Sequence, residues 1–299
     1  MPRSFLYIIL VGLFTFTRLP LAAQTRSENV FGLPVCTEAE TGQTVAALTP
    51  IFEALPEMDP FLLEPEELSP LVLEHDALAS LFWSEISPSL PACREARSVA
   101  DNLGILLNDR LIVVTMLRLA AYESEYGDPD ISALFSESVD TRAARATDYY
   151  DGYCGVMFAQ GVPPIGEPLT TCTDEEVASD VITTLNDAIE NYSDLNQQAL
   201  EIQEDDLAMF LAGYDALSND FWEIIYPNLP ACDAAANLSF IVGNIFDQTL
   251  IVYEFFLLSR YENEYGDAEI GAQIAQSAAN RAASVQQSIE FYFGTTGGE

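Results

Sequence analysis

Acidic side chains gather in one short stretch that occurs twice in the sequence, as ESEYGD at residues 123–128 and as ENEYGD at residues 262–267. Hard divalent cations such as Ca²⁺ prefer clustered carboxylate oxygens, so both stretches are candidate cation sites. Neither stretch has the length or the alternating oxygen ligands of an EF-hand loop. The candidate ligands are Glu123, Glu125, Asp128 and Asp130 in the first stretch and Glu262, Glu264, Asp267 and Glu269 in the second.

The same stretches also read as the end of one helix followed by the start of the next. Gly127 suits the left-handed conformation that ends many helices, Asp128 can cap the following helix, and Pro129 fits its first position. Gly266 and Asp267 repeat the pattern without the proline. The sequence favours this structural role, and the cation site is the functional alternative.

Most catalytic and cofactor schemes lack the residues that they need. The chain has a single histidine, His75, and no zinc-spaced cysteine pair, Glu-x-x-His, glycine-rich phosphate loop or Gly-x-Ser-x-Gly. Carboxylate-only catalysis needs no histidine, but no spacing singles out one pair among 47 acidic residues. We therefore expect a non-enzymatic protein with no catalytic residues and no cofactor except, at most, Ca²⁺. A carboxylate-dependent hydrolase or lyase is the alternative.

Five cysteines predict two disulfides and one odd thiol. Cys36 and Cys172 each precede the first predicted helix of one half of the chain, while Cys93 and Cys232 lie in the first turn of the third. In an up-down-up-down bundle the first and third helices start at the same end, which favours the pairs Cys36–Cys93 and Cys172–Cys232 among the 15 possible arrangements. Cys154 is then a candidate free thiol and a possible crosslinking point.

The two halves of the chain are related by an internal repeat. Residues 82–153 align without a gap on residues 221–292, and the shared segments include FW, LPAC, LIV, EYGD and RAA. We predict an all-α protein, a tandem duplication of a four-helix-bundle-like unit that forms two lobes with one disulfide each. The expected divisions are a signal peptide at 1–23, repeat units at 36–153 and 172–292, a linker at 154–171 and a disordered tail at 293–299.

Apolar residues recur at intervals of three and four, which predicts four helices in each unit. Pro91 and Pro230 suit the first turn of the third helix, where a missing N–H costs nothing. The expected ranges in the first unit are 41–57, 66–87, 91–126 and 129–150, and those in the second unit are 175–195, 204–225, 230–265 and 268–292.

The third helix of the second unit is nearly long and apolar enough, at residues 238–259, to span a membrane. The break at NDR, residues 108–110, in the first unit favours a buried central bundle helix for both copies. If the third and fourth helices form an antiparallel hairpin, Glu254 and Arg281 lie at the same height and are expected to form a partly buried ion pair. Trp83 and Trp222 are expected to pack between helices.

The net charge and the N-terminal residues limit the partners and the compartment that we expect for the protein. The formal net charge is −36 and the sequence contains no lysine, which excludes nucleic acid as a partner and favours cations or basic proteins. Residues 1–23 have the basic start, short apolar run and small residues of a signal peptide. We expect an extracellular, periplasmic or cell-surface protein with no membrane span in its mature chain. Its expected role is binding a protein, a cation or an apolar ligand, and a structural envelope or matrix component is a further alternative.

Overall fold

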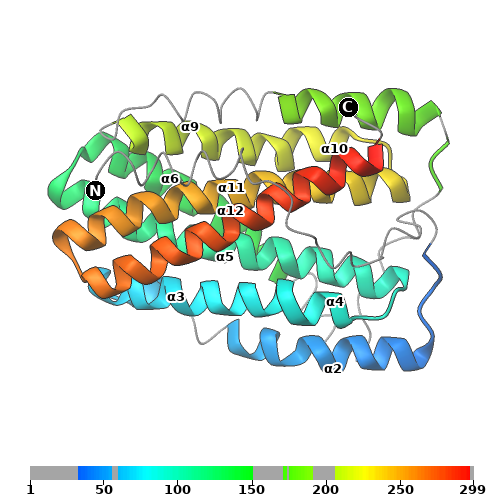
Figure 1. Cartoon of the computed structure of the whole chain (residues 1–299), viewed down its shortest axis with the longest axis horizontal. Helices are drawn as coiled ribbons and strands as arrows, with labels where there is room; N and C mark the ends of the chain where they lie inside the picture. Colours follow the sequence, from blue (N-terminus) through cyan, green and yellow to red (C-terminus); the bar gives the residue numbers. More distant parts are fainter. Residues whose placement is uncertain (1–32, 56–59, 151–170, 174, 191–205, 297–299) are drawn as a thin grey trace. The chain divides into compact units, whose positions relative to one another are not determined.

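The part of the chain that the structure describes is all-helical, which confirms the all-α part of the predicted fold class. A computed structural model describes residues 33–55, 60–150, 171–173, 175–190 and 206–296, and this part of the chain contains no β-strand (Figure 1). It divides into two compact units. The N-terminal unit contains Leu33–Pro168 with Tyr265–Ile274, and the C-terminal unit contains Leu169–Glu264 with Ala275–Glu299. The predicted signal peptide, Cys154 and all of the predicted linker except Thr171 lie outside the described residues.

One long helix organises the N-terminal unit. This helix, α5, packs against α3, α6 and α2, and Figure 1 shows α2, α3 and α5 running alongside one another. Apolar side chains along α5, such as Leu103, Leu106 and Leu111, are at most 2% exposed and form the centre of the core. The helices are α2 (Glu38–Ala54), η2 (Pro60–Leu62), α3 (Pro65–Leu81), η3 (Phe82–Ile86), α4 (Ser87–Ser89), α5 (Arg94–Tyr126) and α6 (Pro129–Tyr149).

The C-terminal unit is built on a helix of the same length as α5, because α5 and α11 both have 33 residues. Tyr253 of α11 packs edge-on against Tyr214 of α9, with ring centroids 5.8 Å apart. The buried Tyr292 of α12 donates to Asn186 at 2.9 Å, and burial raises the pKa of this tyrosine to about 12. The helices are η5 (Glu176–Val181), which continues as helix through residue 190, α9 (Leu207–Asp220), η7 (Phe221–Ile225), α10 (Tyr226–Asn228), α11 (Asp233–Tyr265) and α12 (Ala268–Thr296).

Three of the predicted boundaries were wrong. Pro91 and Pro230 precede the long helices instead of lying in their first turns, since α5 begins at Arg94 and α11 at Asp233. Cys93 takes the N-cap position of α5 with an extended backbone. At the other end of the chain, α12 continues through Thr296, so the residues from 293 to 296 are helical and not part of a tail. The buried Tyr292 anchors this last turn.

Each unit contains a five-residue π-helix directly before a short helix with proline at its second position. In η3 the N–H of Ser87 bonds to the carbonyl of Phe82, and in η7 the N–H of Tyr226 bonds to the carbonyl of Phe221. Such wider turns change the direction in which side chains leave the helix. Here the second residue of each π-helix is a tryptophan, Trp83 or Trp222, which packs toward the long helix of its unit. This confirms the expectation that both tryptophans pack between helices.

The tryptophans are accommodated by glycines within the long helices. A Cβ at Gly104 of α5 would lie 2.5 Å from Cη2 of Trp83. A Cβ at Gly243 of α11 would lie 2.6 Å from Cη2 of Trp222 and 2.7 Å from Cε1 of Phe221. Contacts this short do not occur between real side chains, so a helical glycine is required at both positions despite its unfavourable helix propensity.

We expect Gly243→Ala to destabilise the chain relative to Gly213→Ala, the matched control. Gly213 lies in α9 with nothing within 4 Å of a built Cβ, so this control gains only the ~1 kcal/mol by which alanine exceeds glycine in a helix. Gly243→Ala has the same advantage in helix propensity, but its methyl group overpacks the tryptophan. Its free energy of unfolding should therefore be about 1–3 kcal/mol lower than that of Gly213→Ala. Urea unfolding of both variants measures the difference, and equal stabilities would contradict the packing described.

Candidate functional site

One disulfide in each unit joins the start of the long helix to the segment that precedes the first helix of that unit. They are Cys36–Cys93 and Cys172–Cys232, with Cα atoms 5.0 and 5.1 Å apart, and both pairings confirm the prediction. Disulfides form and persist in oxidising compartments, so the two bridges favour an extracytoplasmic environment. They cross-link residues that are 57 and 60 positions apart in the sequence, which restricts the unfolded chain.

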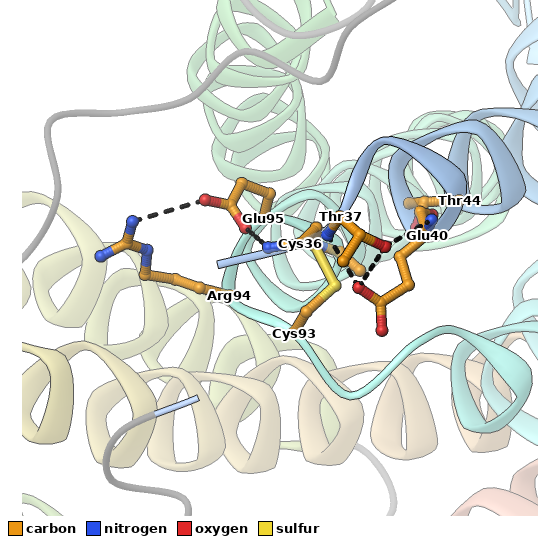
Figure 2. Close-up of a disulfide and its surroundings, with 8 residues drawn as sticks. Cys36, Thr37, Glu40, Thr44, Cys93, Arg94 and Glu95 are labelled. Atoms are coloured by element: carbon orange, nitrogen blue, oxygen red, sulfur yellow. Dashed lines mark hydrogen bonds and ion pairs between the residues drawn. A yellow bond between two sulfur atoms is a disulfide. The ribbon is translucent and has the colours of Figure 1, made fainter. Parts of the chain in front are cut away.

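A buried carboxylate lies against the first of these disulfides (Figure 2). Glu95 is 6% exposed, and its Oε2 accepts the backbone N–H of Cys36 at 2.6 Å. Arg94 Nη2 lies 3.4 Å from Glu95 Oε1, and the N–H of Ala96 points at Cys36 Sγ at 3.3 Å. Among the described residues, Cys36, Cys93 and Glu95 form the one group whose potential metal-ligand atoms all lie within 4.8 Å of one another. Glu95 was not predicted from the sequence, although a glutamate two residues after Cys93 was an available signal.

The residue after each first cysteine caps a helix. Thr37 and Glu40 form a capping box at α2, in which the N–H and the hydroxyl of Thr37 donate to Glu40 Oε2 at 2.7 and 2.8 Å. Thr173 and Glu176 make the same contacts in the C-terminal unit at 2.8 and 2.9 Å. Hydrogen bonds from the threonine backbone and hydroxyl lower the pKa of both glutamates, because they stabilise the ionised carboxylates.

The first acidic stretch forms a helix end, but not in the way expected. Gly127 has φ of −123° and ψ of −128°, so the predicted left-handed conformation was wrong. Glycine is needed there for space, because a Cβ would lie 3.0 Å from Cδ of Glu123. Glu123 is 2% exposed, and its Oε2 accepts the N–H of Asp128 at 3.0 Å. Asp128 caps α6 through Asp130 N–H at 2.8 Å, and Pro129 is its first residue, as predicted.

The second acidic stretch repeats part of this arrangement. Asp267 Oδ1 accepts the N–H of Glu269 at 2.8 Å at the start of α12, and Glu262 is 1% exposed. The other candidate ligands, Glu125, Asp130, Glu264 and Glu269, lie on exposed positions. Within the described ranges, no three of the eight carboxylates bring ligand atoms within 4.8 Å of one another. The observed contacts are those of helix caps, and a cation site at these residues stays a prediction.

Buried ionic contacts link the third and fourth helices of the N-terminal unit. Asp109 of α5 is fully buried, and its Oδ1 accepts from Arg142 Nη1 at 2.8 Å and from Arg145 Nη2 at 2.5 Å. The predicted ion pair involved only the second unit, Glu254 with Arg281. Asp109 was not predicted as an ionic partner, although it lies in the NDR break of the apolar run, and this break was the available signal.

The C-terminal unit places a neutral residue in the position of Asp109. Arg281 Nη1 donates to Gln248 Oε1 at 2.6 Å, and both side chains are buried. Glu254, the predicted ion-pair partner of Arg281, is fully buried in the same helix, α11. The Glu254–Arg281 pair itself stays a prediction. Next to Gln248, the buried Asp247 accepts from Ser218 Oγ at 2.7 Å and from Trp222 Nε1 at 3.0 Å.

Helix α11 is apolar and long enough to cross a membrane by composition alone. The span Ala234–Tyr265 reaches a mean hydropathy of 1.4, and 83% of its most apolar window is buried inside the protein. A central helix of a globular core passes the same test because its neighbours cover its apolar surface. The burial favours the central-helix interpretation, and the absence of a membrane span stays a prediction.

One further acid has a strongly perturbed ionisation. Asp101 of α5 lies one helical turn after Arg97, with Nε and Oδ1 2.8 Å apart, and its side chain is 16% exposed. Burial raises the pKa of Asp101 from 3.8 to about 6, and the charge and hydrogen bond of Arg97 lower it only in part. The sequence did not single out this residue among the other acids.

Comparisons with protein-family models, with curated proteins and with solved structures find no match for this chain.

We expect Asp109→Ala to destabilise the N-terminal unit by about 3–5 kcal/mol, because it removes the carboxylate that two buried or half-buried guanidinium groups contact. Gln248→Ala, at the matched position of α11, removes a neutral partner of Arg281 and should cost about 1–3 kcal/mol. Denaturant unfolding with the disulfides intact measures both. If Asp109→Ala lost no more free energy of unfolding than Gln248→Ala, the ionic contacts of Asp109 would stabilise the fold no more than the neutral contact of Gln248.

We expect Asp101 to make the protein less stable as the pH rises. Its pKa is raised on folding, so the folded state binds the proton more tightly, and the resulting stability is present below pH 4 and lost as the pH rises through about 6. A difference of about 2 pKa units corresponds to about 3 kcal/mol at most. The stability of Asp101→Asn relative to the parent should therefore be greater at pH 8 than at pH 4. Asp140→Asn, at an exposed position of α6, controls for the loss of one surface charge, and an equal gain in this control would contradict the prediction.

Proposed function

We propose that this chain is a secreted, non-enzymatic interaction module, formed by two copies of one helical unit, that binds a cationic protein segment through its acidic surface. The two copies are supported by features that recur 139 residues apart in the chain. These are the 33-residue helices α5 and α11, the π-helices η3 and η7, the glycines Gly104 and Gly243 under tryptophans, and the disulfide cysteines Cys93 and Cys232 before the long helices. Each copy would be a four-helix-bundle-like lobe.

The separation of charge between interior and surface carries the functional proposal. The sequence has 11 arginines and no lysine, and the eight arginines of the described part are all buried or half-buried. Arg118, for example, is 8% exposed and donates to Ser69 Oγ at 2.8 Å and to Tyr122 Oη at 2.6 Å. The described arginines are thus at least partly withdrawn from solvent, while acids such as Glu38, Glu53 and Glu74 lie on exposed positions. The surface field attracts cations and basic chains.

Exposed acids from three helices meet at one end of the N-terminal unit. The start of α3 is close to the end of α5, because Ser69 contacts Arg118 and because Glu66 acts electrostatically on Tyr126. Tyr126 is 47% exposed, and a hydrogen bond to Glu125 raises the pKa of its hydroxyl. We call this group the acidic end, and its members are Glu64, Glu66, Glu67, Glu125, Asp128 and Asp130. An exposed aromatic ring among carboxylates suits a lysine- or arginine-rich segment, which offers both charge and cation–π contact.

The buried acids support a structural role over catalysis. Asp109 bonds to two arginines, Asp247 to a serine and a tryptophan, and Glu123 to a backbone N–H. A carboxylate-dependent hydrolase or lyase would instead need two acids directed at a shared substrate position. A structural envelope or matrix role would depend on Cys154, which lies outside the described residues. The proposed secretion is supported by the oxidised cysteine pairs and the signal-like N-terminus.

A titration with a lysine-rich peptide tests the proposal. We expect the oxidised chain to bind the peptide with an affinity that falls steeply with salt. The triple variant Glu66→Gln, Glu125→Gln, Asp130→Asn should weaken binding about tenfold, because it removes charge from the acidic end. The matched control Glu53→Gln, Glu74→Gln, Glu137→Gln removes the same charge from exposed positions elsewhere in the unit and should leave the affinity within about twofold.

Fluorescence anisotropy at 0.05 and 0.15 M salt measures these affinities. Equal losses in the two triple variants would contradict a localised surface and leave only the overall field. No measurable binding by the parent chain at 0.15 M salt would contradict the proposed function itself.

A further inference from the structure

Three tyrosines form an aromatic cluster in the N-terminal unit, which includes Tyr265 and the residues that follow it. The rings of Tyr126 and Tyr265 are stacked, with centroids 4.3 Å apart and planes 4° from parallel. The ring of Tyr122 is tilted toward both, with its centroid 6.2 Å from that of Tyr126 and 6.4 Å from that of Tyr265. The stacked pair consists of the two tyrosines of the repeated EYGD stretch, so the repeat brings two copies of one aromatic residue together.

The cluster has a buried side and an exposed side. Tyr122 is 3% exposed, whereas Tyr126 and Tyr265 are 47% and 42% exposed. Stacking removes only one face of each ring from water, and the apolar surface that stays hydrated is unfavourable. The outer surface of the stacked pair is therefore a place where a ligand with a flat, weakly hydrated group gains contact.

The chain itself shows which group pairs with a ring of this cluster. Cζ of the Arg118 guanidinium lies 4.1 Å from the centre of the Tyr122 ring, on the buried side. A guanidinium is planar and more weakly hydrated than an ammonium, so it stacks on an aromatic face at a smaller cost in hydration. The inner ring already has such a partner from the same chain, and the two outer rings present the same chemistry to solvent.

Carboxylates near the outer rings set the sign of the charge that is attracted there. The hydrogen bond from the Tyr126 hydroxyl to Glu125 raises the pKa of this tyrosine, and the charges of Glu125 and Glu66 act in the same direction. The charge of Arg118 acts in the opposite direction, with a smaller effect than that of Glu125. The field at the exposed ring therefore favours a cation.

We propose that Tyr126 and Tyr265 recognise an arginine side chain of the cationic segment, whose guanidinium stacks on the exposed tyrosine pair while its charge faces the nearby carboxylates. The inference rests on the proposed function and narrows it, because it selects arginine over lysine at this place. A lysine ammonium is compact and strongly hydrated, and it lacks a planar face that stacks on a ring. The overall negative field attracts both residues and supplies no such preference.

Two peptides that differ only in their basic residue test the proposal. They have equal length and equal charge in a Gly–Ser background, one with arginine and the other with lysine. The oxidised full chain should bind the arginine peptide about two- to fivefold more tightly, the difference that one exposed cation–π contact supplies. Tyr126→Leu combined with Tyr265→Leu should remove this preference by weakening the binding of the arginine peptide. Fluorescence anisotropy at one salt concentration measures the affinities, and circular dichroism checks that the variant is folded.

Two control variants separate the ring faces from other effects. Tyr126→Phe combined with Tyr265→Phe keeps both rings and removes both hydroxyls, so it should retain the preference for arginine. Tyr226→Leu removes a tyrosine of similar exposure, 39%, from the C-terminal unit and should also retain it.

Three results would overturn the inference. These are equal binding of the two peptides by the parent, a preference that survives Tyr126→Leu with Tyr265→Leu, and a preference that is lost in Tyr126→Phe with Tyr265→Phe. Equal binding by the parent would leave the proposed function standing, because the acidic surface would still bind basic chains. Binding of neither peptide would overturn the proposed function together with the inference.

Discussion

Both units depend on satisfying the polar groups that their long central helices carry into the core. Each long helix has 33 residues and is covered by its neighbours over most of its length. A buried carboxylate or amide on such a helix loses its hydrogen bonds to water and needs partners in the protein to replace them. Asp109, Glu123 and Asp247 all face this constraint, and each has found donors on another helix or at a helix end. The neighbouring helices are thereby positioned by specific contacts as well as by apolar packing.

The two units meet this constraint differently at matched positions. In the N-terminal unit Asp109 takes two arginines, whereas in the C-terminal unit Gln248 takes one. One position earlier along the helix, Asp247 is bound by Ser218 and Trp222. Breaking a buried ionic contact costs more than breaking a neutral one, because it leaves a charge in a medium of low polarisability. The N-terminal unit is therefore held by the contacts that are more sensitive to substitution.

The use of arginine inside the fold has a consequence at the surface. The net charge is −36 and the described arginines are buried or half-buried, so acids dominate the described surface, and self-repulsion among them opposes compactness. Two disulfides at the starts of the long helices and capping boxes after the first cysteines counter this tendency at one end of each unit.

The helical class, the approximate helix ranges, both disulfide pairings and the cap formed by Asp128 and Pro129 could all be predicted from the sequence. These follow from local periodicity, from backbone preferences and from the count of cysteines, which need no knowledge of neighbours in space. The need for glycine at Gly104 and Gly243 is visible only in the folded chain, since the tryptophans that exclude a Cβ are distant in sequence. The tertiary structure also shows that Gly127 makes room for Glu123 instead of adopting a left-handed conformation, that Asp109 meets Arg142, and that Glu95 lies against Cys36. Each of these depends on the distance between two groups in the folded chain, and the sequence gives the groups but not the distances between them.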